Sequence, residues 1–176
     1  MIKRIAITGP ESTGKTWLAE NLARHFHTVF VPEFARMHLS VIQRPYTYDD
    51  ILIIAKQQFH NNQQVLPGAD AVLFLDTELI VTKIWCEVKY GRCHPWIIDH
   101  IGKQHFDIYL VPDIDIPWEP DPQREHPHMR DYLMQLYLKE LETRRFPYRI
   151  IGGEKEERLK NAIKALESLD KLRGEC

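Results

Sequence analysis

Residues 9–16 read Gly-Pro-Glu-Ser-Thr-Gly-Lys-Thr, and they are the starting point for interpreting this 176-residue sequence. They fit the pattern G-x-x-x-x-G-K-[ST] of a phosphate-binding loop, which requires a strand before it and a helix after it. Ile2 to Thr8 is a short apolar run typical of a strand, and Lys15 to Phe26 carries apolar residues at the four-residue spacing of a helix. The sequence therefore predicts a phosphate-binding loop here, with an ordinary glycine turn as the alternative.

The chemistry of such a loop follows from its residue types. Its glycines let the backbone bend so that successive N–H groups and the helix N-terminus face a phosphate. The Lys15 ammonium would neutralise the β- and γ-phosphate oxygens, and the Thr16 hydroxyl would bind Mg²⁺. The sequence predicts ATP and Mg²⁺ as cofactors, and the predicted binding residues are Gly9, Glu11, Ser12, Thr13, Gly14, Lys15 and Thr16.

Beyond the loop, short apolar runs alternate with helical patterns. The runs at residues 28–31, 71–75, 108–111 and 148–151 are each followed by a segment that can form a helix. The second and third of these runs are apolar throughout, as expected for strands that are covered on both faces. Together with Ile2 to Thr8, they predict a three-layer α/β fold with a five-stranded parallel sheet, helices on both faces and one domain over residues 1–176.

Three helix starts are predicted from local signals. Thr47 with Asp50 three residues later resembles a capping box, Thr77 can cap the helix after the run at 71–75, and Pro127 stands at the start of a further helix. The segment before that helix is rich in proline and acidic residues. We interpret residues 112–130 as a functional loop, a lid over the site.

The composition narrows the classes of function. The chain is 44% apolar and 27% charged, and no apolar run approaches the ~18 residues of a membrane span. The first residues lead directly into a strand, without room for a signal peptide. Cys86, Cys93 and Cys176 form neither a disulfide framework nor a zinc pattern. With a net charge of −2 and no basic stripe, we expect a soluble, cytoplasmic protein without membrane or nucleic-acid partners. The oligomeric state stays open.

Two carboxylates follow predicted strands. Asp76 ends the run at 71–75 and is the predicted Walker B acid, which would bind the metal together with Thr16; a helix-capping carboxylate is the alternative. Glu33 follows Val31-Pro32, and Arg36 lies one helical turn later. Because a kinase that acts on a hydroxyl needs an acceptor for its proton, we predict Glu33 as the base, with Arg36 also contacting the substrate. The alternative is a surface ion pair worth ~0–1 kcal/mol.

Two arginines lie in and just after the predicted lid. Closure of the lid could bring Arg124 and Arg130 onto the phosphoryl group, where such an arginine increases the rate by ~10³–10⁵. Ordinary surface charges are the alternative. The predicted catalytic residues are Lys15, Glu33, Asp76, Arg124 and Arg130. One or two of the aromatic residues Phe34, Tyr48, Phe59, Trp85 and Trp96 could stack on a flat substrate ring, with the others in the core.

Several of these segments together resemble the ribosylnicotinamide kinase domain of the NadR family. They are the loop at 9–16 and residues 31–36, 56–58, 75–77, 85–86, 90–95 and 116–124. Val-Pro-Glu33 is also similar to the deoxynucleoside kinases, in which the matching glutamate is the base for the 5′-hydroxyl. The resemblance implies a P-loop kinase fold and transfer of phosphate from ATP to nicotinamide riboside, a small-molecule nucleoside, giving nicotinamide mononucleotide. It also implies that Gln57 contacts the nucleoside.

The sequence departs from this family at two points. Family members often carry an adenylyltransferase domain with an H-x-G-H motif, which this sequence lacks, so we do not expect it to make NAD itself. Asp121-Pro122 stands where the resemblance predicts Asp-Gly, which bears on the flexibility of the lid. Two alternative functions follow: a kinase for another nucleoside, and a P-loop ATPase that regulates a partner, although the sequence has no Asn/Thr-Lys-x-Asp run for guanine.

Overall fold

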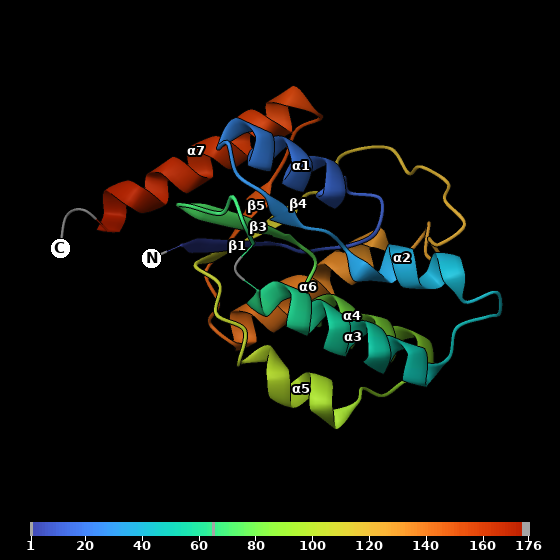
Figure 1. Ribbon diagram of the computed structural model, residues 1–176. Coiled ribbons are helices and arrows are strands. Elements are labelled where there is room, and N and C mark those ends of the chain that lie inside the picture. Colours follow the sequence, from blue (N-terminus) through green and yellow to red (C-terminus); the bar gives the residue numbers. More distant parts are fainter. Residues whose placement is uncertain (1, 65, 174–176) are drawn as a thin grey trace.

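Five strands form one parallel sheet in the computed structural model, which describes residues 2–64 and 66–173 (Figure 1). The strands are β1 (Lys3–Ile7), β2 (Phe30–Val31), β3 (Val72–Asp76), β4 (Ile108–Pro112) and β5 (Tyr148–Ile151). Their order across the sheet is β2-β3-β1-β4-β5, and every neighbouring pair is parallel. The predicted five-stranded parallel sheet is confirmed.

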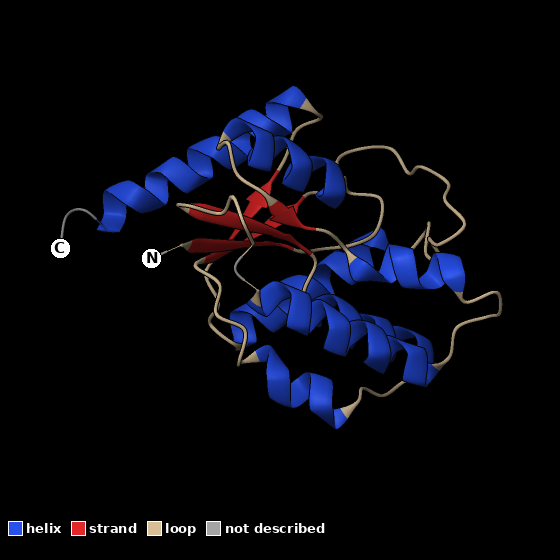
Figure 2. Ribbon diagram, in the orientation of Figure 1, coloured by secondary structure: helices blue, strands red, loops and turns tan. Residues whose placement is uncertain are grey.

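Helices cover both faces of this sheet. They are α1 (Lys15–His25), α2 (Phe34–Val41), α3 (Tyr48–Gln63), α4 (Leu79–Tyr90), α5 (Pro95–Ile101), α6 (Arg130–Thr143) and α7 (Glu156–Arg173). Figure 2 shows the strands between two helical layers, and Figure 1 identifies α1 and α7 on one side and α3 to α6 on the other. This is the fold of P-loop kinases that the sequence predicts.

The side chains of the central strands explain why their sequences are apolar throughout. Ile5 and Ile7 of β1 belong to the same buried cluster as Leu22 of α1, whereas Ala6, between them, belongs to the cluster on the opposite face, with Ile84 of α4. Because successive side chains of a strand point to opposite faces, a strand between two helical layers needs apolar residues at every position. Strand β4 alternates between the same two clusters.

The capping signals were right for one helix and wrong for another. Thr47 accepts a hydrogen bond from the Asp50 N–H, and the Asp50 carboxylate accepts one from the Thr47 N–H at 2.7 Å, so the predicted capping box is confirmed. Helix α4 is capped not by Thr77 but by Glu78, whose carboxylate accepts from the Ile80 N–H at 2.7 Å. Thr77 has a φ of 72°, which removes it from the capping position.

Helix α6 begins at Arg130, three residues after the predicted start at Pro127. Residues 126–129 form a separate turn, in which the Met129 N–H donates to the His126 carbonyl. This turn ends the loop that joins β4 to α6, residues 113–129, which we call the lid. The lid leaves the carboxyl end of the sheet, where the phosphate-binding loop also lies.

Strand register determines which residues meet at that end. Ile7, which precedes the loop, pairs with Asp76 of β3, and Val31 pairs with Leu75. Parallel strands bring their carboxyl ends to one edge of the sheet, where ligands bind in folds of this kind. The loop, Asp76 and the segment after β2 are therefore neighbours.

Two further features concern predictions made above. No helix in the described part of the chain combines the length and apolar character needed to cross a membrane. Cys86 is buried and Cys93 partly buried, both as free thiols, and Cys176 lies outside the described residues.

Candidate active site

The phosphate-binding loop has the backbone that its glycines permit. Gly9 and Gly14 have φ values of 131° and 77°, which residues with a Cβ rarely adopt. Gly14 stands at the N-terminus of α1, so the first N–H groups of that helix face the centre of the loop. The Lys15 ammonium donates to the Pro10 carbonyl at 2.7 Å. Desolvation lowers the pKa of Lys15, and the charges of Glu33 and Asp76 act in the opposite direction.

The two predicted metal ligands are in direct contact. The Thr16 hydroxyl donates to Asp76 Oδ2 at 2.6 Å. Asp76 is fully buried, and its other oxygen, Oδ1, has no hydrogen-bond partner among the described residues. Burial, followed by repulsion from Glu33, raises the pKa of Asp76 to about 7. A buried carboxylate oxygen without a partner beside a hydroxyl fits the oxygen ligands of Mg²⁺.

Glu33 points towards this cluster instead of capping its own helix. It is the N-cap residue of α2, with an extended backbone and no hydrogen bond from its side chain to the helix. Arg36 Nε lies 3.7 Å from Glu33 Oε2, and the charge of Glu33 acts on both Lys15 and Asp76. The carboxylate predicted as the base therefore lies near the phosphate-binding lysine.

A buried amide network binds the backbone on both sides of Glu33 through Gln58, whereas the resemblance implied that Gln57 contacts the nucleoside. Gln58 Oε1 accepts from the Phe34 N–H at 2.7 Å, and Gln58 Nε2 donates to Asn62 at 2.9 Å. Gln57 donates to Asn61 and does not line the cavity described below. The signal that could have distinguished the two is the buried stripe of α3, which contains Gln58 and Asn62 but not Gln57.

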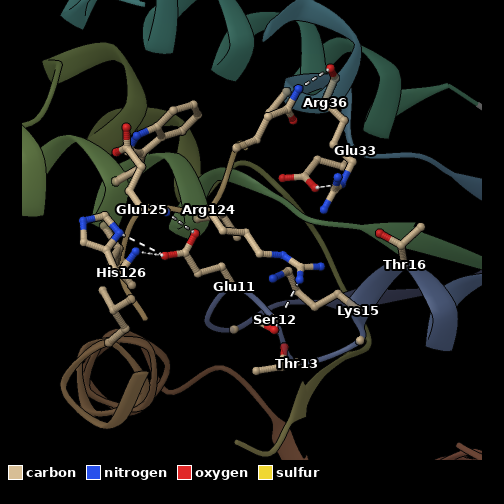
Figure 3. A pocket seen from close by; sticks show the side chains of 18 of the residues that line it. Glu11, Ser12, Thr13, Lys15, Thr16, Glu33, Arg36, Arg124, Glu125 and His126 are labelled. Atoms are coloured by element: carbon tan, nitrogen blue, oxygen red, sulfur yellow. Dashed lines mark hydrogen bonds and ion pairs between the residues drawn. The ribbon is translucent and has the colours of Figure 1, made fainter. Parts of the chain in front are cut away.

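The lid is bonded to the phosphate-binding loop. The Ser12 hydroxyl accepts from the Glu119 N–H at 2.9 Å and from Arg124 at 3.3 Å. Glu11 accepts from the backbone N–H groups of Glu125 and His126, at 3.1 and 2.6 Å, and from the His126 ring at 3.1 Å. Figure 3 shows Arg124 and His126 reaching towards Ser12 and Glu11.

The two predicted lid arginines have different positions. Arg124 lines the cavity between the lid and the loop. Arg130 is absent from the cavity lining; it donates to the Ser12 carbonyl at 3.2 Å and to the Ile116 carbonyl at 2.8 Å. In this arrangement Arg130 joins the lid to the loop, and only Arg124 of the two faces the enclosed space.

The loop, Glu33 and the lid enclose a cavity of about 510 Å³, within the range for small-molecule sites. Its charged end contains Glu11, Lys15, Glu33, Arg36 and Arg124. Its apolar and aromatic lining, which we call the apolar end, consists of Leu39, Tyr46, Val81, Ile84, Trp85, Val88, Leu133 and Tyr137. Of the five aromatic residues considered from the sequence, Trp85 lines the cavity, whereas Tyr48 stacks on His94 and Phe59 packs against Trp96.

Polar residues that the sequence did not indicate connect the apolar end to the lid. The Tyr46 hydroxyl donates to Glu125 at 2.6 Å and accepts from Trp85 Nε1 at 2.9 Å, and Lys89 donates to Glu125 at 2.9 Å. Desolvation and the bond to Glu125 raise the pKa of Tyr46 to about 12, so it remains a donor at neutral pH.

Arg158 of α7 was also missed. It is 2% exposed, and its guanidinium donates to the Thr13 carbonyl of the loop, to the Asp113 carbonyl and to the Asp115 carboxylate. Arg158 thus joins the phosphate-binding loop to the first residues of the lid. A basic residue on a charged terminal helix carries no sequence signal of this role.

A family model described as an AAA domain matches residues 4–158. The chain belongs to this family. Two curated members of the NadR group are similar in sequence: the trifunctional NAD biosynthesis/regulator proteins NadR of Salmonella typhimurium (strain LT2) and Escherichia coli (strain K12). Each is 30% identical over 127 residues, which is 70% of this chain and 31% of the relative. The chain thus spans about a third of the length of these relatives. The resemblance to NadR drawn from the sequence is confirmed.

Solved structures of a NadR protein and of two other kinases share the fold. A NadR protein in complex with NR superposes with a TM-score of 0.79 at 23% identity, over 96% of this chain and 50% of the other. Thymidylate kinase from Ehrlichia chaffeensis gives a TM-score of 0.68 at 12% identity, over 95% and 98% of the two chains. Deoxyadenosine kinase from M. mycoides gives 0.63 at 12% identity, over 94% and 99%.

The bonds from the lid to Glu11 yield a testable prediction. Glu11→Gln replaces a charged acceptor of two backbone N–H groups with a weaker neutral one, so the lid should open more often. We expect the amides of Glu125 and His126 to exchange with deuterium about 5-fold faster, the effect of losing ~1 kcal/mol. The matched control is Glu20→Gln, at an exposed position of α1. Unchanged exchange in Glu11→Gln would contradict the assignment.

Proposed function

We propose that this protein transfers the γ-phosphoryl group of ATP to the 5′-hydroxyl of nicotinamide riboside, giving nicotinamide mononucleotide. The observation that carries the proposal is one cavity that is lined by the phosphate-binding loop, by the Glu33 carboxylate and by a set of apolar and aromatic side chains. A phosphoryl donor at the loop and a nucleoside against these side chains would meet beside that carboxylate.

The charged end of the cavity supports the transfer step. Lys15 and the N–H groups of α1 would bind the triphosphate, and Glu33 would accept the proton of the alcohol as it attacks the γ-phosphorus. Arg124 would leave the Ser12 hydroxyl for the phosphoryl oxygens, which are stronger acceptors because they are charged. Mg²⁺ held by Thr16 and Asp76 would neutralise the charge on the phosphates.

The apolar end supports a nucleoside with a flat ring as acceptor. Trp85 and Tyr46 offer aromatic surface there, and their polar atoms are already bonded, to Tyr46 and to Glu125 respectively. The choice of nicotinamide riboside rests on similarity to NadR proteins, one of which was solved in complex with NR. We place this activity in the cytoplasm, where the nucleotide donor is abundant.

Product analysis tests the proposed function directly. The protein is incubated with Mg-ATP and, separately, with nicotinamide riboside and a panel of other ribo- and deoxyribonucleosides, and the products are identified by mass. We expect a phosphorylated product from nicotinamide riboside in preference to the rest. Preference for another nucleoside would change the assigned substrate, and phosphate release without any acceptor would favour a regulatory ATPase.

Glu33→Gln should strongly reduce turnover. The amide keeps the shape of the side chain but cannot accept the proton, and a general base contributes ~10²–10⁴ in rate. We expect kcat to fall by well over ~10-fold, with the affinity for a non-hydrolysable ATP analogue retained. Glu20→Gln serves as the control for the loss of one negative charge. Turnover close to wild type would exclude Glu33 as the base.

The raised pKa of Asp76 predicts a pH dependence of nucleotide binding. Below about pH 7 the carboxyl is increasingly protonated and must lose its proton before it can hold Mg²⁺. The affinity for Mg²⁺ with an ATP analogue should therefore weaken as the pH falls, by up to about tenfold per pH unit. Calorimetry in buffers of different ionisation enthalpy should detect proton release near neutral pH.

Asp76→Asn is the control for this titration. The pH dependence of the affinity that remains in this variant comes from the ionisation of the nucleotide itself. The difference between wild type and Asp76→Asn is therefore the contribution of Asp76. Without Mg²⁺, the affinity of wild type for the ATP analogue should lose this contribution and show the same pH dependence as that of Asp76→Asn. An identical pH dependence for wild type and Asp76→Asn would show that the pKa of Asp76 is not raised into the neutral range.

A further inference from the structure

Arg36 lies between two acids that come from different parts of the chain. Its Nη1 donates to Asp121 Oδ2 of the lid at 3.0 Å, while its Nε lies 3.7 Å from Glu33 Oε2. The closer contact is thus the one to the lid. Figure 3 shows Arg36 and Glu33 facing each other on the side of the cavity opposite Glu11 and Ser12.

Asp121 is itself held in a defined orientation. Its Oδ1 accepts from the Gln123 N–H at 2.8 Å, and the Gln123 side chain donates to the Arg36 carbonyl at 3.3 Å. Residues 121–123 therefore bind both the side chain and the backbone of Arg36. The bonds from Gln123 and Arg36 hold the pKa of Asp121 below its usual range, so it is ionised at neutral pH.

This contact differs from the other bonds of the lid. Glu119, Arg124, His126 and the backbone N–H of Glu125 contact the phosphate-binding loop, whereas Asp121 and Gln123 reach the first turn of α2. The lid thus touches the side of the cavity that carries the predicted base. Among the described residues, the bonds of Asp121 and Gln123 to Arg36 link the position of the lid to the surroundings of Glu33.

The geometry has a consequence for proton transfer. An arginine free to turn would form a bidentate pair with the nearest carboxylate, and here the nearest carboxylate on α2 is Glu33. Such a pair would occupy the oxygens that the alcohol needs. With Nη1 bound to Asp121, the contact of Arg36 with Glu33 runs from Nε at 3.7 Å, which is too long for a hydrogen bond.

We infer that Asp121 is a positioning residue for phosphoryl transfer: from the closed lid it holds Arg36 away from a bidentate pair with Glu33, and so keeps that carboxylate available to the acceptor alcohol. This inference rests on the proposed function. It adds a role for the lid beyond covering the cavity, because the base is ready to accept a proton only when the lid lies over the bound reactants.

Asp121→Asn tests the inference through the separation of kcat from KM. With the nucleoside that wild type accepts, we expect kcat to fall by roughly 5- to 10-fold, because Arg36 then pairs with Glu33. The KM for ATP should change by less than about 2-fold, since the phosphate-binding loop is untouched. Asp121→Glu keeps the carboxylate and should recover part of the lost kcat. Asp131→Asn, an exposed site in the first turn of α6, is the matched control.

A double-mutant cycle identifies the path of the effect. Because Asp121 acts through Arg36, adding Asp121→Asn to Arg36→Gln should cause no further loss of kcat. Losses that multiply, no recovery in Asp121→Glu, or an effect confined to KM would overturn the inference while leaving the proposed function in place. Wild-type protein that phosphorylates no nucleoside at all would instead overturn the proposed function, and this inference with it.

Discussion

The parallel pairing of β1 with β3 is the interaction on which the rest of the site depends. It places Ile7 opposite Asp76, so that the loop after β1 and the carboxylate at the end of β3 emerge side by side. Pairing of β2 with β3 adds the segment that carries Glu33. Because strand register cannot shift by one residue without turning every side chain to the opposite face, the apolar core that fixes these strands also fixes the distances between the charged groups.

Two cationic side chains of the site, Lys15 and Arg124, are bonded to acceptors that are weaker than a phosphate. Lys15 donates to the Pro10 carbonyl and Arg124 to the Ser12 hydroxyl, both neutral oxygens. A triphosphate offers charged oxygens to the same donors, and such hydrogen bonds are roughly twice as strong. These donors are therefore already directed into the cavity, and binding requires them to exchange partners, not to be brought from elsewhere in the fold.

The sequence predicted those parts of the site that depend on local patterns. The loop, Asp76 and Glu33 each follow an apolar run, and strand order then brings them together. It could not predict contacts between distant segments: Gln58 was distinguished from Gln57 only by the packing of α3, and Arg158 reaches the loop from a helix more than a hundred residues away. Glu11 fits the loop pattern at a position open to any residue, so its bonds to the lid left no trace in the motif.

Thr77 lies between two buried acids, Asp76 and Glu78, that differ in their hydrogen bonds. Burial raises the pKa of both Asp76 and Glu78 to about 7, yet Glu78 has a hydrogen bond on each oxygen, from Thr8 and from the Ile80 N–H. Asp76 Oδ1 has none within the described residues. The φ of 72° at Thr77, which is unfavourable for a β-branched residue, lets the chain direct one carboxylate into the fold and the other towards the loop. A fold that leaves one buried carboxylate oxygen without a hydrogen bond gives up stability at that position, and a bound cation could restore it.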